Sequence, residues 1–247
     1  MVIPSRKSAV LGALALALLL VAALVPAAPA LAQVGTPDNA AYADLYAAME
    51  ESVDQRMTAD AALAALAREF AVAPEFAAAE AESPGLIDEV IAGLRPIFMA
   101  QSERVRLLYR PSTLALFARH LTPEEATSIA AFYRSDLGRK LMGGMVRNYS
   151  PEETLSNLDT EAPVTREQVE ADMKKATNAA VAAMTQDDLI ALGKLAQARP
   201  ELFKLSLIGA GVQELRVQME NEPLTAEEDA AVAAMIEDVF NRRFPAE

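Results

Sequence analysis

His and Cys, which often serve as catalytic bases, nucleophiles and metal ligands, are scarce in this chain, which has one His, His120, and no Cys among its 247 residues. A zinc site built from His and Cys is therefore excluded, and so is any metal site that needs several His ligands. His120 could be the base of a Ser-His-Asp triad, with Ser135 as the nucleophile. Ser135 lies in no Gly-x-Ser-x-Gly motif, however, and His120 directly precedes a predicted helix. We therefore interpret His120 as a surface or linking residue.

Paired carboxylates occur at Glu124 and Glu125. Adjacent helical residues point about 100° apart, so the pair does not converge on one substrate atom. Their place at the start of a helix is explained by capping and by the helix dipole. Gly143-Gly144 lacks the spacing of a phosphate-binding loop, and no Asp-x-Asp-x-Asp-Gly run indicates a calcium site. The sequence predicts no catalytic residue, no metal and no cofactor.

A binding site is the remaining possibility, and its candidate residues cluster in one predicted helical hairpin. The candidates are Phe132, Tyr133, Ser135, Gly138 and Lys140. In the functional interpretation, the bend of the hairpin lines a pocket or a docking surface. In the structural one, the two aromatic rings anchor the core, the serine caps a helix and the glycine permits close helix approach. Lys140 then pairs with Asp136, four residues before it.

This hairpin has a clear sequence pattern. Thr122-Pro123-Glu124-Glu125 is typical of a helix start, with Thr122 as cap and Glu125 completing a capping box. Ser135 can cap a second helix.

The run from Leu121 to Lys140 resembles the core of a bacterial family, domain of unknown function 2059. The family pattern is a hydrophobic-Thr/Ser-x-Glu-Glu start followed by Phe-Tyr-x-Ser-Pro-x-Gly-x-Lys. The chain has the pattern residues Phe132, Tyr133, Ser135, Gly138 and Lys140, and has Asp136 where the family usually has Pro. The resemblance implies a secreted or periplasmic helical domain and supplies no established activity.

The N-terminus predicts an exported protein. Arg6 and Lys7 precede an apolar run, residues 9–25, and Ala30-Leu31-Ala32 forms a small-x-small cleavage site. We predict a signal peptide over residues 1–32 that is cleaved after Ala32, which places the protein in the periplasm of a Gram-negative cell. The alternative is retention of the run as an N-terminal anchor.

The charge of the chain excludes some partners. The net charge of −13 becomes −15 when residues 1–32, with their two basic residues, are removed. An acidic protein is repelled by nucleic acid and by anionic lipid, so we expect neither as a partner, and no stable membrane insertion after cleavage.

The composition predicts an all-α fold, because Ala, Leu, Glu, Met and Arg are plentiful and β-branched runs are scarce. We expect one domain over residues 33–247, a bundle of eight to ten short helices broken at prolines such as Pro96 and Pro111. Residues 148–164 are polar and could link two halves, 33–147 and 165–247. Near the N-terminus we expect one helix to run through Met57 and the next to be capped by Thr58.

An internal duplication is one interpretation of a repeated motif. Residues 121–125 and 184–188 have the same Thr-x-acid-acid start 63 residues apart, and one inserted residue aligns Asp136 with Pro200 and Lys140 with Lys204. The alternative is that any capped helix begins in this way, as residues 57–60 and 224–228 also do.

The function that these patterns favour is that of a non-enzymatic exported protein that binds an envelope partner or a small apolar ligand. Its 10 Met residues could form an adaptable apolar groove. The alternatives are an enzyme that uses carboxylate, Tyr and Lys groups, and an assembly factor without a pocket. The sequence does not specify the oligomeric state.

Overall fold

The computed structural model describes residues 35–156 and 162–245, so the predicted signal peptide, residues 1–32, lies outside the described residues. Within them the chain forms ten α-helices and one short 3-10 helix, and no strand. The predicted all-α, multi-helix fold is confirmed.

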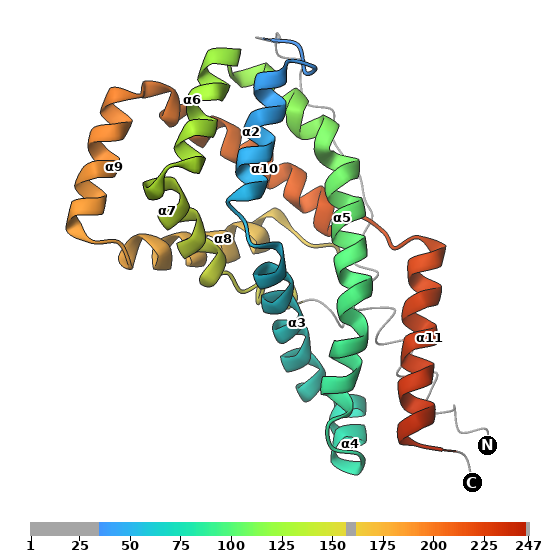
Figure 1. Cartoon of the computed structure of the whole chain (residues 1–247). Helices are drawn as coiled ribbons and strands as arrows, with labels where there is room; N and C mark the ends of the chain where they lie inside the picture. Colours follow the sequence, from blue (N-terminus) through green and yellow to red (C-terminus); the bar gives the residue numbers. More distant parts are fainter. Residues whose placement is uncertain (1–34, 157–161, 246–247) are drawn as a thin grey trace.

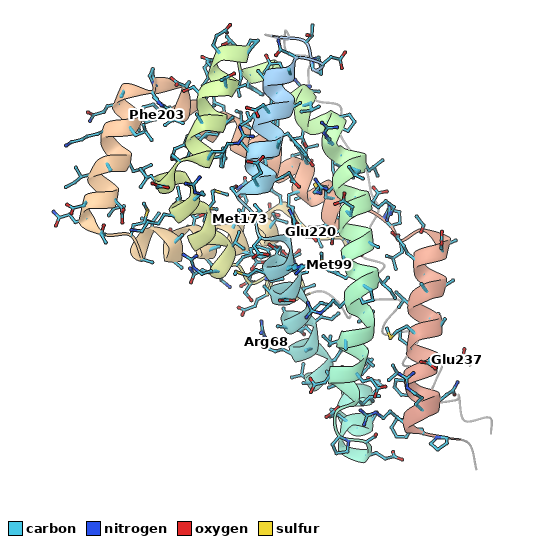
Figure 2. The ribbon with its side chains drawn as sticks, in the orientation of Figure 1. Arg68, Met99, Met173, Phe203, Glu220 and Glu237 are labelled. Atoms are coloured by element: carbon cyan, nitrogen blue, oxygen red, sulfur yellow. The ribbon has the colours of Figure 1, made fainter. Side chains whose placement is uncertain are left out.

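Figure 1 shows the arrangement of the helices, and Figure 2 adds the side chains that fill the space between them. In chain order the elements are α2 (Ala40–Glu51), α3 (Gln55–Val72), α4 (Pro74–Glu82), α5 (Leu86–His120), α6 (Pro123–Arg134), α7 (Asp136–Arg147), α8 (Arg166–Ala182), α9 (Gln186–Ala198), η1 (Pro200–Lys204), α10 (Leu205–Glu220) and α11 (Ala226–Arg243).

Helix α5 is the longest element and runs through the middle of the molecule (Figure 1). Its 35 residues span about 50 Å at 1.5 Å per residue. Pro96 and Pro111 lie inside it, so the prediction that Pro96 and Pro111 break the chain into shorter helices is wrong. Tertiary packing explains this: α3 and α11 pack against α5, as do α2 and α10, and these contacts offset the lost backbone hydrogen bonds.

Two large clusters of buried apolar residues, and a third small one at Val164 and Val169, hold the fold together, and α5 contributes to both large clusters. The first core joins α2, the C-terminal part of α5, α6, η1 and α10; it contains Tyr42, Leu45, Phe117, Ile129 and Phe132. The second core joins α3, α4, the N-terminal part of α5 and α11; it contains Leu63, Phe76, Val90, Ile236 and Val239. The last helix of the chain therefore shares a core with helices near its beginning.

The boundary between α2 and α3 differs from the prediction. Helix α2 ends at Glu51, and α3 begins at Gln55 with Asp54, not Thr58, as its cap. The Asp54 carboxylate accepts hydrogen bonds at 3.0 Å from the N–H groups of Arg56 and Met57. An aspartate beside free backbone donors starts a helix as well as a threonine does, and here it does so four residues earlier.

The connection that follows α7 is fixed to α8 by a buried carboxylate. Asp172 is only 1% exposed, and its oxygens accept hydrogen bonds from the backbone N–H of Glu153 and from both the N–H and the hydroxyl of Thr154. Three donors compensate for the burial of the charge.

Candidate functional site

The hairpin of α6 and α7 has the local structure that its sequence predicts. The Thr122 hydroxyl accepts from the Glu125 N–H at 3.3 Å, and the Glu125 carboxylate accepts from the Thr122 N–H at 2.9 Å. The Ser135 hydroxyl accepts from the Gly138 N–H at 3.0 Å and donates to the Phe132 carbonyl at 2.7 Å. Both predicted caps are confirmed.

Gly138 is required by the tight bend between α6 and α7. A Cβ atom at this position would lie 2.0 Å from the carbonyl oxygen of Phe132. No side chain fits there without a backbone shift.

Phe132 and Tyr133 point into the protein interior. Both side chains are in the first core, and their ring centroids are 5.8 Å apart. Burial raises the pKa of the Tyr133 phenol to about 12, so this group is neutral at physiological pH.

Lys140 does not pair with Asp136, and that prediction is wrong. Asp136 instead pairs with Arg139 at 2.6 Å, whereas Lys140 pairs with Asp188 at the start of α9. Lys140, together with hydrogen bonds from Thr185, lowers the pKa of the Asp188 carboxyl to about 2. Helical spacing alone allows either partner, and the fold supplies a carboxylate from 48 residues away.

The five candidate residues are thus brought together by the hairpin, but they do not surround a cavity. Phe132 and Tyr133 are core, Ser135 and Gly138 shape the bend, and Lys140 joins α7 to α9. Their role as a binding site stays a prediction.

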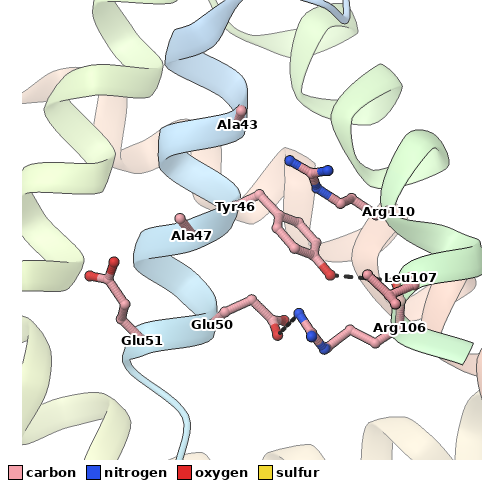
Figure 3. A pocket seen from close by; sticks show the side chains of 8 residues that line it. All are labelled: Ala43, Tyr46, Ala47, Glu50, Glu51, Arg106, Leu107 and Arg110. Carbon is pink, nitrogen blue, oxygen red and sulfur yellow. Dashed lines mark hydrogen bonds and ion pairs between the residues drawn. The ribbon is translucent and has the colours of Figure 1, made fainter. Parts of the chain in front are cut away.

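An open groove of about 370 Å³ lies on the other side of α2, between α2 and α5 (Figure 3). Its lining residues are Ala43, Tyr46, Ala47, Glu50, Glu51, Arg106, Leu107 and Arg110.

Three of the four charged side chains that line the groove have ion-pair partners in the described part of the chain, and Arg110 does not. Arg106 pairs with Glu50 at 2.7 Å, and Glu51 pairs with Arg134 at 2.9 Å. Burial raises the pKa of the Glu50 carboxyl, although Arg106 opposes this effect. The Arg110 guanidinium lies 5.7 Å from the centre of the Tyr46 ring and makes no ion pair with any residue that the structure describes. Arg110 is therefore available to an anion.

The apolar part of the groove is formed by small and exposed side chains. Ala43 and Ala47 lie one turn apart on α2, and Leu107 on α5 is 53% exposed. An apolar surface beside an unpaired guanidinium can hold a molecule with an apolar part and an anionic group.

Sequence reasoning missed this groove because its two walls are about 60 residues apart in the chain. One signal was present: Arg106 and Arg110 are four residues apart, which places two guanidinium groups on one helical face.

Within 35–156 and 162–245, no group of three or more His, Asp or Glu side chains is placed to hold a metal ion. Among those residues, no helix has the length and apolar character needed to cross a bilayer.

Comparison with known proteins gives one match. Residues 110–147 match the family model described as uncharacterized protein conserved in bacteria, DUF2059. The resemblance is confirmed for this segment. The DUF2059 segment begins at Arg110 in the groove and includes all of α6 and α7. No curated protein and no solved structure matches the chain.

Proposed function

We propose that this chain is an exported, non-enzymatic binding protein whose α2–α5 groove takes a small apolar ligand with one anionic group. The observation that carries the proposal is Arg110, which stacks on Tyr46 at the edge of an apolar groove and has no carboxylate partner among the described residues. In a chain with a formal net charge of −13, acidic partners for an arginine are abundant. An arginine that still lacks one fits a ligand-binding role.

The size of the groove agrees with this class of ligand. About 370 Å³ is at the lower end of the range for small-molecule sites, which is roughly 300–1,000 Å³. Arg106 of α5 and Glu50 of α2 neutralise each other across the groove, so Arg110 determines the charge preference.

Export is the second part of the proposal, and residues 1–32 support it by their basic start, apolar run and small-x-small site. N-terminal sequencing of the protein from the periplasmic fraction should begin at Gln33. A protein that retains Met1 in the membrane fraction would contradict cleavage.

Native mass spectrometry of the protein purified gently from its source cell tests the binding role. We expect a mass above that of the chain, which is lost on denaturation. Arg110→Gln should lose the extra mass, and Ala47→Leu should also lose it because the larger side chain fills the groove.

Arg56→Gln is the matched control, since Arg56 is an exposed arginine on α3 with no ion pair to a described residue. The proposal would be contradicted if the wild type showed no extra mass, or if Arg110→Gln and Arg56→Gln retained the extra mass to the same extent.

A further inference from the structure

Two parts of the chain have the same succession of elements. In the first unit, residues 86–147, α5 leads to α6 and α7; in the second unit, residues 166–220, α8 leads to α9 and then to η1 with α10. Helices α6 and α9 both begin with a complete capping box, at Thr122 and Thr185. Each is followed by a single residue before the next helix begins.

Contacts between the two units are reciprocal. Lys140 of the first unit pairs with Asp188 of the second, and Lys204 of the second pairs with Glu125 of the first. Each carboxylate is the third residue of its capping-box helix, and each lysine is the fifth residue of the helix that follows. Helix α7 packs against α8, and its counterpart α10 packs against α5. Contacts that repeat with exchanged partners are characteristic of a two-fold interface.

In the first unit, α6 is covered by α2. Helix α2 packs closely against α6, and Ala126 and Ala130 of α6 are at most 1% exposed. They share the first core with Tyr42 and Leu45 of α2. Small residues on α6 thus receive the large apolar side chains of an amphipathic helix.

In the second unit, the corresponding face of α9 is open. The residues 63 positions after Ala126 and Ala130 are Leu189, which is 41% exposed, and Gly193, where an added Cβ would meet no atom within 4 Å. Ile190 beside them is 47% exposed, and no residue of α9 is fully buried.

Figure 1 shows α9 at the edge of the molecule. Among the described elements its backbone packs chiefly against the adjacent η1, and its Leu192 and Leu195 side chains are partly buried against the first core. Phe203 in η1 (labelled in Figure 2) adds a further exposed apolar side chain. A helix with so much exposed apolar surface is typical of one that packs against a partner.

We propose that the two units are structurally equivalent and that the open face of α9 binds an amphipathic helix of a partner protein, in the way that α6 packs against α2. This face is formed by Leu189, Ile190, Gly193 and Lys194. The partner helix presents apolar residues at the spacing of Tyr42 and Leu45 and a carboxylate that meets Lys194.

Charge supports this choice of partner. Helix α2 carries Asp44 and Glu51, which both pair with Arg134 of α6, and it contains no basic residue. On α9, Lys194 is exposed and makes no ion pair with the described part of the chain. The apolar stripe of α6 therefore has its counterpart at Leu189 and Gly193, and Lys194 supplies a positive charge one turn before Gln197, the residue 63 positions after Arg134.

A synthetic peptide with the α2 sequence, residues 38–52, is the probe, because the chain's own α2 already occupies α6. The fluorescently labelled peptide is titrated with protein expressed from the full chain, at 0.15 M salt, where long-range repulsion between two acidic molecules is screened. Anisotropy should rise to saturation for the wild type. Leu189→Glu should weaken binding about tenfold or more, and Lys194→Glu should weaken it by a smaller factor.

Leu108→Glu is the matched control, since Leu108 is an exposed leucine on α5 that lies outside the groove, and it should bind the peptide as the wild type does. Ala47→Leu, which fills the groove, should also bind it, so this test is independent of the small-ligand proposal. A peptide with Tyr42→Ala and Leu45→Ala should not bind.

Three results would overturn the inference. In the first, the wild type does not bind the peptide. In the second, Leu189→Glu binds the peptide as tightly as the wild type does, which would mean that the peptide displaces α2 from α6. In the third, the chain binds phospholipid vesicles through Leu189 and does not bind the peptide, which would make the face a lipid contact.

Discussion

At the scale of single residues, one position is used repeatedly for two tasks. The third residue of a helix with a capping box helps to hold the helix start, and in three helices its carboxylate also pairs with a basic residue from a distant part of the chain. The pairs are Glu125 with Lys204, Asp188 with Lys140 and Glu228 with Arg104. Each such carboxylate links local structure to tertiary structure, so the sequence motif marks a long-range contact as well as a helix start.

The pKa of Asp188 tests this link. Its folded value of about 2 lies below the ordinary 3.8, so the interaction stabilises the fold above pH 3.8 and is lost as the pH falls through about 2. Lys140→Met should raise the pKa of Asp188 towards its ordinary value, as measured by a carboxyl NMR titration. Lys194→Met removes a positive charge from α9 that does not pair with Asp188, and it should leave the pKa of Asp188 nearly unchanged.

Two buried tyrosines should respond differently to loss of the hydroxyl. The Tyr42 hydroxyl donates to the Leu121 carbonyl at 2.7 Å in the first core, and Tyr42→Phe leaves that carbonyl without its donor. We expect a loss of about 1–3 kcal/mol in the free energy of unfolding. The Tyr133 hydroxyl has no hydrogen bond to a described residue, and Tyr133→Phe should cost less than about 0.5 kcal/mol. Urea denaturation compares the two, and equal losses would contradict the assignment.

At the scale of the elements, two glycines in helices have opposite surroundings. Gly138→Ala should destabilise the protein by about 1–3 kcal/mol, because the new Cβ would collide with the Phe132 carbonyl. Gly193→Ala should stabilise it by up to about 1 kcal/mol, because α9 gains a better helix former and the site is open. Thermal unfolding of both variants would show changes of opposite sign, and changes of equal sign would contradict this account.

Local signals in the sequence were sufficient for several helix starts, although not for α3, where Asp54 and not Thr58 is the cap. Thr122, Ser135, Thr165 and Thr225 act as caps because a side-chain oxygen meets backbone donors within three residues. The continuous α5 was not predictable in this way, because the packing of four other helices outweighs the intrinsic effect of Pro96 and Pro111.

The site was less predictable than the fold. The partner of Lys140 and the two walls of the groove are brought together by tertiary contacts between residues tens of positions apart. Sequence patterns located the hairpin residues but not the residues that pack around them. Those tertiary contacts decide which of the hairpin residues belong to the core and which lie at the surface.

At the scale of the whole molecule, α5 joins two cores that have no other shared helix among those described. The five tyrosines all lie outside α3, α4 and α11, so tyrosine fluorescence reports on the part around the first core. Because α5 extends into both cores, we expect damage in one to lower the stability of the other.

Ile236→Ala in α11 tests this coupling. Ile236 is 2% exposed in the second core, and its truncation should cost about 2–5 kcal/mol. The urea midpoint should fall equally by circular dichroism and by tyrosine fluorescence. Val72→Ala, at a position that is 74% exposed, should change the stability by less than about 0.5 kcal/mol. A fluorescence midpoint that stays unchanged in Ile236→Ala would mean that the two cores unfold separately.

The position of α11 also sets the order in which the protein can complete its fold. The second core needs Val232, Ile236 and Val239, which belong to the last helix, whereas its other members precede Val105. A ribosome delivers α3, α4 and the first half of α5 more than 100 residues before it delivers α11. During that interval the part of α5 that α11 later covers has no partner there, so the nascent chain carries an exposed apolar surface until synthesis is almost finished.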